Sequence, residues 1–249
     1  MANPIKTKAT VSYLGDCGDG VYIVRFKCDQ HLPRHKPGQF LHLALDEYDP
    51  FGGFWPASRV FSIASSAGSE ELQIVFSVKG DYTRRMSKEL RVGSEVWLKL
   101  PFGDFVIDFR ARNDQDVVLV AGGTGISPYI PFLSEMVDVK SRRARTYLAY
   151  GVRAPGLVIF EELLSRCLSR PGFALDLFVE GGDGDGLPEA MRESTHAGIL
   201  SFEDVWTRSY AMDNPVYFLS GPPGMILFFR KRLLDAGVNA EKIGIDEWK

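Results

Sequence analysis

The sequence predicts two domains of different class: an antiparallel Greek-key β-barrel at residues 1–113 and an α/β domain with a parallel sheet at residues 114–249. Two observations carry this prediction. In the first half of the chain, short β-type segments alternate with glycine-containing turns, which is typical of barrels and sandwiches. In the second half, strand-like and helix-like segments alternate, which is typical of a parallel sheet. The boundary is expected at the polar segment 114–116.

The first domain is expected to consist of short strands from about residue 8 to residue 110. The clearest strand-like segments are residues 21–26, 39–45, 72–78 and 95–100. Glycines punctuate them at Gly38, Gly80, Gly93 and Gly103. One short helix is expected at residues 83–90.

The second domain begins with residues 117–121, a continuous apolar run that is typical of a parallel strand buried on both faces. Ile243 and Ile245 alternate like the residues of a final strand of the same sheet. The glycine-rich segment 181–201 is expected to be a long mobile excursion. The remaining elements are expected as strands at 146–150, 174–179 and 216–219 and as helices at about 129–137, 159–167 and 225–236.

Composition excludes several classes of function. The formal net charge of −3 does not favour a nucleic-acid partner, and no stretch reaches the ~18–20 apolar residues of a membrane span. The first residues lack the apolar core of a signal peptide. Cys17, Cys28 and Cys167 are too few and too widely spaced for a disulfide framework or an iron–sulfur site. A cytoplasmic protein with reduced thiols is therefore expected, and His31 and His35 are expected to be surface residues rather than metal ligands.

A glycine-rich turn follows the buried strand at 117–121. It reads Gly-Gly-Thr-Gly-Ile-Ser-Pro over residues 122–128. Glycines allow the backbone to approach a phosphate closely, and a helix N-terminus offers unpaired N–H groups and a positive dipole end. Ser127 suits the N-cap of the next helix and Pro128 its first position. The alternative is an ordinary strand-to-helix turn.

Two further segments carry candidate binding groups. Residues 59–62 read Arg-Val-Phe-Ser, where the arginine could clamp a phosphate. The alternative there is an edge strand with an exposed arginine. Residues 217–225 read Tyr-Phe-Leu-Ser-Gly-Pro-Pro-Gly-Met and follow a strand at the carboxyl edge, where α/β sheets bind ligands. The alternative is a rigid Pro-Pro turn. The basic run at 140–145 could be a solvated helix end or a docking patch for an acidic acceptor.

The order and spacing of these segments resemble the ferredoxin–NADP reductase superfamily over nearly the whole chain. Arg59, Phe61 and Ser62 match its R-x-[YF]-S segment, which lies against the flavin. The remaining matches are Gly80 to Thr83 with the flavin-phosphate turn, Pro101 to Gly103 with G-P-[YF]-G (Leu100 replaces the first glycine), Gly122 to Pro128 with the nucleotide pyrophosphate turn, Tyr150 to Arg153 with the segment after the second strand, and Ser220 to Met225 with C-G-P-P-x-M (Ser220 replaces the cysteine).

The resemblance implies a site that holds a flavin and a nicotinamide nucleotide. It implies that Ser62 hydrogen-bonds near flavin N5 and that Thr124 and Ser220 flank the nicotinamide. Trp248 is expected to cover the flavin, because relatives end in an acidic residue, a spacer and an aromatic; the alternative is that it anchors the chain end. Ser62, Ser220 and Trp248 are the expected catalytic residues. The expected cofactor-binding residues are Arg59, Val60, Phe61, Ser62, Gly80, Tyr82, Thr83, Gly122, Gly123, Thr124, Gly125, Arg153, Gly221, Pro222, Met225 and Trp248.

The implied activity is hydride transfer from NADH or NADPH to FAD (FMN is possible), followed by electron transfer to a ferredoxin, a flavodoxin or an oxygenase component. NADH is favoured, because residues 154–156 read Ala-Pro-Gly and residues 180–183 read Glu-Gly-Gly-Asp, where acidic groups would repel a 2′-phosphate. Two alternatives stay open: an electron-transfer subunit of a larger complex, and a reductase of free flavin or a small oxidant.

Overall fold

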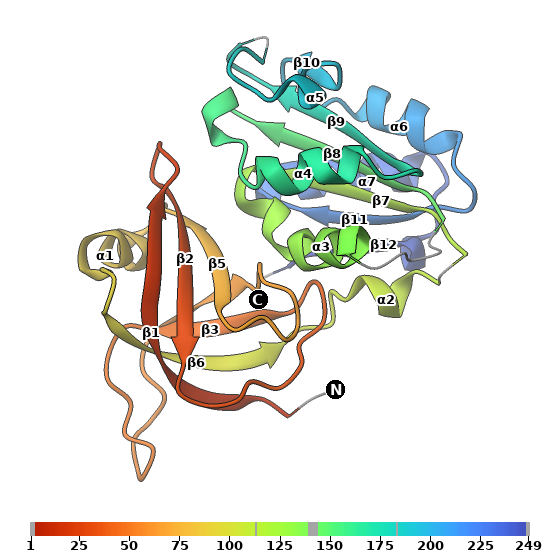
Figure 1. The fold of residues 1–249 in the computed structure, drawn as a ribbon. Coiled ribbons are helices and arrows are strands. Elements are labelled where there is room, and N and C mark those ends of the chain that lie inside the picture. The colour runs from red at the N-terminus through yellow and green to blue at the C-terminus, as the bar shows by residue number, and fades with distance from the viewer. Residues whose placement is uncertain (1–2, 113, 139–143, 183, 248–249) are drawn as a thin grey trace.

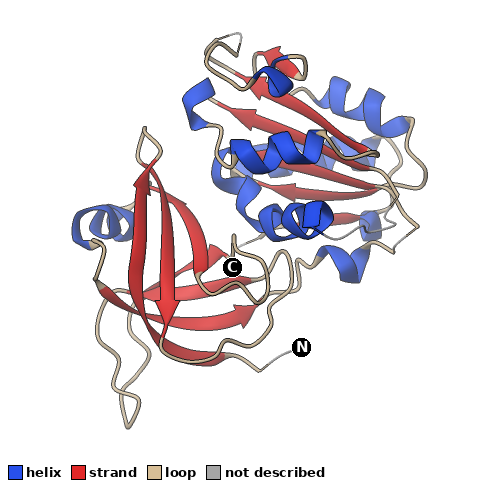
Figure 2. Ribbon diagram, viewed as in Figure 1, coloured by secondary structure: helices blue, strands red, loops and turns tan. Residues whose placement is uncertain are grey.

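The computed structural model describes residues 3–112, 114–138, 144–182 and 184–247. Its chain forms a β-barrel followed by an α/β domain, and the two lie side by side (Figure 1). Strands dominate the first domain, whereas helices flank the sheet of the second (Figure 2). Among the described residues, no helix is long and apolar enough to cross a membrane.

The first domain is an antiparallel, nearly closed six-stranded barrel, as the sequence predicts. Its strand order is β4-β3-β6-β1-β2-β5. The strands are β1 (Ile5–Asp16), β2 (Val21–Cys28), β3 (Phe40–Ala44), β4 (Ser58–Ser62), β5 (Leu72–Ser77) and β6 (Glu95–Phe102), and helix α1 (Asp81–Glu89) follows β5. Alternation positions the core: Val24 and Phe26 are buried in β2, while Arg25 between them faces solvent.

The second domain is a parallel six-stranded sheet with the order β10-β9-β8-β7-β11-β12. Its strands are β7 (Val117–Gly122), β8 (Thr146–Val152), β9 (Phe173–Val179), β10 (Thr195–Ala197), β11 (Val216–Ser220) and β12 (Ile243–Ile245). Its helices are α3 (Ile130–Asp138), α4 (Glu161–Leu168), α5 (Glu189–Arg192), α6 (Phe202–Tyr210) and α7 (Pro223–Asp235), with 3₁₀ turns η1 (Gly123–Tyr129), η2 (Pro155–Leu157) and η3 (Ala240–Lys242).

Helices cover both faces of this sheet (Figure 1). Val117 and Leu119 pack in one core with residues of α3 and α4. Val118 and Val120 pack in a second core with residues of α6 and α7. Every residue of β7 from Val117 to Ala121 is therefore buried, which is why this strand is continuously apolar.

Three sequence-based expectations about individual segments and residues are wrong. Segment 181–201, expected as a long mobile excursion, contains helix α5 and the edge strand β10 among its described residues, and α6 follows it. Ser127 does not cap a helix: η1 already includes it, and its hydroxyl donates to the Thr124 carbonyl at 2.7 Å. His35 is buried rather than on the surface, and its Nε2 lies 2.7 Å from the Ser65 carbonyl oxygen. His31 is exposed, as expected.

The connection between the domains is packed rather than free. Helix α2 (Ile107–Arg110) follows the barrel, and Phe105 and Ile107 are buried in the same core as Leu119 of the sheet. Val21 and Val75 of the barrel belong to this core as well. The polar segment 114–116 lies between α2 and β7, and we retain the division after residue 113 as a proposal.

Candidate functional site

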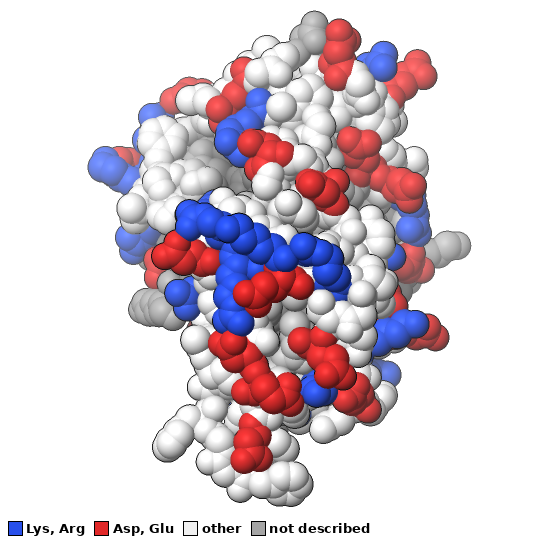
Figure 3. Space-filling model, turned by 90° about the vertical axis from the view of Figure 1, so that its left-hand side faces the viewer, with Lys and Arg blue, Asp and Glu red and all other residues white. Residues whose placement is uncertain are grey.

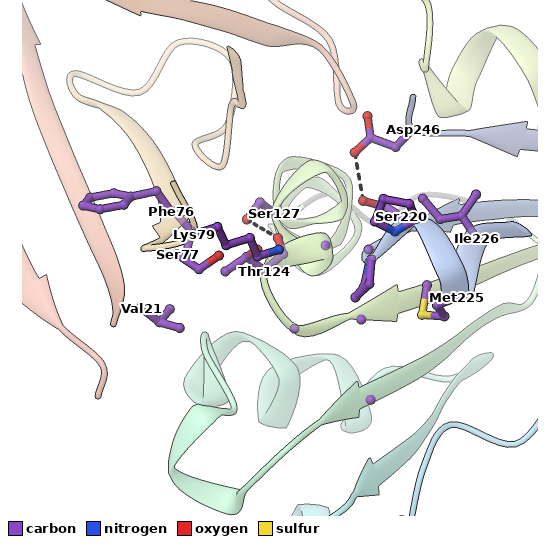
Figure 4. Close-up of a pocket in the computed structure, with 18 of the residues that line it drawn as sticks. Val21, Phe76, Ser77, Lys79, Thr124, Ser127, Ser220, Met225, Ile226 and Asp246 are labelled. Atoms are coloured by element: carbon purple, nitrogen blue, oxygen red, sulfur yellow. Dashed lines mark hydrogen bonds between the residues drawn. The ribbon is translucent and has the colours of Figure 1, made fainter. Parts of the chain in front are cut away.

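A cavity of about 1400 Å³ lies between the two domains. On the barrel side it is lined by β4, the end of β5 and the start of α1, and on the other side by the carboxyl ends of β7, β8 and β11. Figure 4 shows both walls, with Ser77 and Lys79 on the barrel side and Thr124 and Ser220 on the other side, while the Phe76 ring points away from them into the barrel core. The cavity is larger than the usual ~300–1,000 Å³ ligand pocket, so it has room for more than one small ligand.

Strand β4 places an arginine and a hydroxyl on the barrel wall. Ser62 and Phe61 are buried at its end, whereas Arg59 is exposed. The Arg59 guanidinium lies over the Tyr82 ring, 5.1 Å from its centre. Tyr82 is itself fixed, because its hydroxyl donates to the Leu43 carbonyl at 2.8 Å. Arg59 is thereby held near the start of α1, where its guanidinium can meet an anion.

The N-terminus of α1 forms the neighbouring part of this wall. Gly80 is its N-cap, and the Thr83 hydroxyl accepts hydrogen bonds from the backbone N–H of Lys79 at 2.9 Å and of Gly80 at 3.2 Å. These bonds fix the turn. The first N–H groups of a helix point outward without partners within the helix, and the dipole there favours negative charge. With Arg59 beside it, this corner suits a phosphate.

Figure 3 looks at the face that carries α1. Lys and Arg side chains form a band across it, next to a recess. Helix α1 carries Arg84, Arg85 and Lys88, and the cavity wall adds Arg59 and Lys79. The barrel side of the cavity is therefore the more basic side.

The glycine-rich turn after β7 packs tightly against the turn after β11. A side chain at Gly125 would place its Cβ 2.3 Å from the Ser220 carbonyl oxygen, and one at Gly122 would meet Pro222 and Met225 at 2.7 and 2.8 Å. Gly123 differs: its φ is +53° and it faces open space. Gly122 and Gly125 thus allow the two turns to pack against each other, whereas Gly123 leaves the cavity floor unobstructed.

A buried acid lies behind this floor. Asp246 is 6% exposed and accepts a hydrogen bond from the Ser220 hydroxyl at 2.8 Å, as Figure 4 shows. Burial raises the pKa of Asp246 to about 7, and the Ser220 hydrogen bond opposes this rise. Asp246 is not among the site residues expected from the sequence. Its place after the alternating pair Ile243 and Ile245, at the carboxyl edge of the sheet, was the available signal.

Every expected site residue within the described part of the chain lies on the cavity wall. On the barrel side these are Arg59 to Ser62, Gly80, Tyr82 and Thr83, and on the other side Gly122 to Gly125, Arg153, Ser220 to Pro222 and Met225. Trp248 lies outside the described residues, so its role stays a prediction. Segment Pro101 to Gly103 ends β6 and is not part of the wall.

Other candidates lie elsewhere. In the basic run 140–145, residues 140–143 lie outside the described part, and Arg145 pairs with the buried carboxylate of Asp116 at 2.7 Å. The described residues contain no cluster of three or more His, Cys, Asp or Glu side chains arranged for a metal ion. The lining residues that sequence reasoning missed include Asp19, Lys79 and Phe178.

Comparison with known proteins agrees with this architecture. Residues 119–231 match the model of the oxidoreductase NAD-binding domain family. A flavohemoprotein of Rhizobium meliloti is 26% identical over 220 residues, which cover 84% of this chain and 51% of that protein. The reductase component of a Pseudomonas phenol 2-monooxygenase is 27% identical over 235 residues, which cover 91% of this chain and 61% of that protein. The chain thus spans between half and two thirds of the length of these two relatives.

A solved ferredoxin NADP⁺ reductase from Neisseria gonorrhoeae, with bound FAD and NADP, has the same fold. It matches 96% of this chain and 96% of its own with a TM-score of 0.73 and 19% sequence identity. Residues 119–231 thus match the oxidoreductase NAD-binding domain family, and together with the barrel before them they form the same two-domain fold as that solved reductase.

Proposed function

We propose that this protein is a flavin-dependent oxidoreductase that takes hydride from NADH or NADPH and passes the electrons to an acceptor. The observation that carries the proposal is the shared cavity, because it brings the phosphate corner of the barrel and the nucleotide turn of the α/β domain to opposite walls of one space. The gonococcal reductase, which has this fold, was solved with both FAD and NADP bound.

The residues of this chain would bind and orient two cofactors that supply the hydride chemistry themselves. Arg59 and the N-terminus of α1 would bind flavin phosphates, with FAD favoured over FMN. Ser62 would hydrogen-bond to the flavin ring, and the turns at Gly123 and Gly221 would leave room for the nicotinamide nucleotide. We further propose that Trp248 stacks on the flavin and moves aside during turnover.

The physiological acceptor in this proposal is a redox protein such as a ferredoxin, a flavodoxin or an oxygenase component. A relative that is the reductase component of a monooxygenase supports this class of acceptor. The basic band beside the cavity supports an acidic partner, because opposite charges steer encounter. The electron-transfer subunit and the reductase of small oxidants remain the alternatives. We also retain the expectation of a cytoplasmic location, to which the three free cysteines are suited.

The first test is whether the purified protein carries flavin and oxidises NADH with ferricyanide as acceptor. The sharper test replaces Arg59 with alanine. This change removes charge-assisted hydrogen bonds worth about 1.5–3 kcal/mol each, so we expect flavin affinity to fall by about tenfold or more. The measurement is the ratio of visible to ultraviolet absorbance after dialysis, followed by chromatography of the released flavin to separate FAD from FMN.

Arg25→Ala is the matched control. Arg25 also lies in a barrel strand with its guanidinium over a tyrosine, 4.9 Å from the Tyr13 ring centre, but it is not part of the cavity wall. We expect this variant to retain its flavin. Full flavin occupancy in Arg59→Ala, or equal loss in both variants, would contradict the phosphate site.

A further inference from the structure

An ion pair crosses the cavity mouth between the two domains. Asp19 lies at the tip of the β1–β2 hairpin of the barrel, and its carboxylate pairs with the guanidinium of Arg153, just after β8. Both residues line the cavity. The hairpin tip was not a candidate in the sequence, because residues 19 and 153 are far apart along the chain and belong to different domains.

The hairpin is built to hold Asp19 in this place. Gly18, Asp19 and Gly20 have positive φ angles of 86°, 49° and 72°, and aspartate is one of the few non-glycine residues that adopts this conformation readily. The Gly18 N–H donates to the Asp16 carboxylate at 2.8 Å, and the Val78 N–H donates to the Gly20 carbonyl at 2.9 Å. The tip is thus fastened both to itself and to the barrel wall.

Arg153 has an equally rigid support. Its carbonyl accepts a hydrogen bond from the Gly181 N–H at 2.9 Å, and the preceding Val152 carbonyl accepts from the Glu180 N–H at 3.0 Å. The residue therefore cannot move far from the end of the sheet without breaking contacts between β8 and β9. Only the exposed end of its side chain is free to exchange partners.

Arg153 is the one basic residue that the α/β domain contributes to the described cavity wall. In nucleotide-binding α/β sheets, an arginine near the carboxyl ends of the strands can accommodate the 2′-phosphate, and Arg153 is the candidate for that role on this wall. Asp19 neutralises that charge, and the exposed Glu180 carboxylate adds a second negative group to the same wall. NADH has no 2′-phosphate, so an occupied arginine does not penalise it.

Resting on the proposed function, we infer that Asp19 is a specificity-determining residue: it occupies Arg153 and thereby selects NADH over NADPH. The pair is solvent-exposed, with side-chain exposures of 55% and 64%, so it is weak enough to exchange. A 2′-phosphate would have to displace the carboxylate and then lie beside its negative charge, whereas removal of that charge leaves Arg153 available.

The experiment is a double-mutant cycle on the flavin-loaded protein with Asp19→Asn, Arg153→Gln and both changes together. We expect Asp19→Asn to raise the ratio of kcat/KM for NADPH to kcat/KM for NADH by about tenfold, mainly through a lower KM for NADPH. In the Arg153→Gln background the same change should leave the ratio unaltered. Titration of each variant with NADP⁺ and NAD⁺ by calorimetry repeats the comparison without turnover.

Asp29→Asn is the control. Asp29 is exposed and directly follows β2, at the opposite end of that strand from the hairpin tip, and it is not part of the cavity wall. An unchanged ratio in Asp19→Asn would overturn the inference and leave the proposed function intact. Equal gains for both nucleotides would also overturn it, because they would place Arg153 at the shared pyrophosphate. Failure of the wild-type protein to bind either nucleotide would overturn both.

Discussion

At the scale of single residues, the buried Asp246 carboxyl predicts a pH-dependent stability. Burial raises its pKa to about 7, well above the value of 3.8 that is usual for an aspartate. Between these two values the folded state keeps the proton that the unfolded state has lost. The free energy of unfolding should therefore fall as the pH rises through this window, by on the order of 1 kcal/mol per pH unit, and level off above pH 7.

Asp246→Asn isolates this effect, because asparagine retains the shape and can still accept from the Ser220 hydroxyl but does not ionise. As the pH rises from about 5 to about 8, we expect the free energy of unfolding of the variant to increase relative to that of the wild type. Denaturant unfolding across this range measures it. Parallel pH profiles for the two proteins would show that Asp246 is ionised throughout or is solvated.

At the scale of elements, the contact between the β7 and β11 turns determines the shape of the cavity floor. Gly125→Ala would drive a Cβ into the Ser220 backbone, where no side chain can rotate away. We expect a loss of stability above about 3 kcal/mol and weaker nicotinamide binding. Thermal unfolding and nucleotide titration measure the two effects.

Gly123→Ala is the matched control in the same turn. A Cβ at this position would have no neighbour within 4 Å, so the expected cost is only that of a left-handed conformation, about 1–2 kcal/mol. Similar stability in the two variants would mean that the turns can separate without cost, and that the glycines serve the ligand rather than the packing.

The elements missed by sequence reasoning share a physical origin. Segment 181–201 is rich in glycine, yet β10 pairs with β9 over Thr195 to Ala197 and is tied to the sheet by a buried acid. Asp176 accepts from the Tyr147 hydroxyl at 2.7 Å, pairs with Arg208 and lies 3.1 Å from His196 Nε2. These partners come from β8, α6 and β10, so the local sequence of the segment does not reveal what orders it.

At the scale of the whole molecule, the two domains share a hydrophobic core. The core that contains Leu119 of the sheet also buries Phe105 and Ile107 of the connection between the domains. Val21 and Val75 of the barrel belong to the same core. Separation of the domains would expose this surface to water. We therefore expect one cooperative thermal transition rather than two. Phe105→Ala should lower the midpoint, at a cost of about 3–5 kcal/mol.

Calorimetry on the flavin-loaded protein tests this expectation by comparing the calorimetric and van't Hoff enthalpies. Two resolved transitions, or a Phe105→Ala effect confined to one of them, would mean that the barrel and the α/β domain unfold independently. Val92→Ala is a suitable control, because Val92 is an exposed apolar residue of the barrel and its loss should leave the transition unchanged.

The sequence alone determined the division into a barrel and an α/β domain, because strand alternation and the buried run at 117–121 are local patterns that reflect burial directly. It also identified the ordered motifs around Arg59, Gly80, Gly122 and Ser220, since these turns need particular residues at fixed spacing. Such patterns do not depend on knowledge of distant contacts.

Only the tertiary structure decided how these motifs meet. Three contacts at the site join residues that are remote in sequence. They are the ion pair of Asp19 with Arg153, the hydrogen bond of Ser220 to Asp246, and the contact of Gly125 with the β11 turn. Charge, pKa and steric fit at the site depend on these contacts. Because these contacts arise from the packing of elements that are distant in sequence, both within the α/β domain and between the two domains, no local pattern could have specified them.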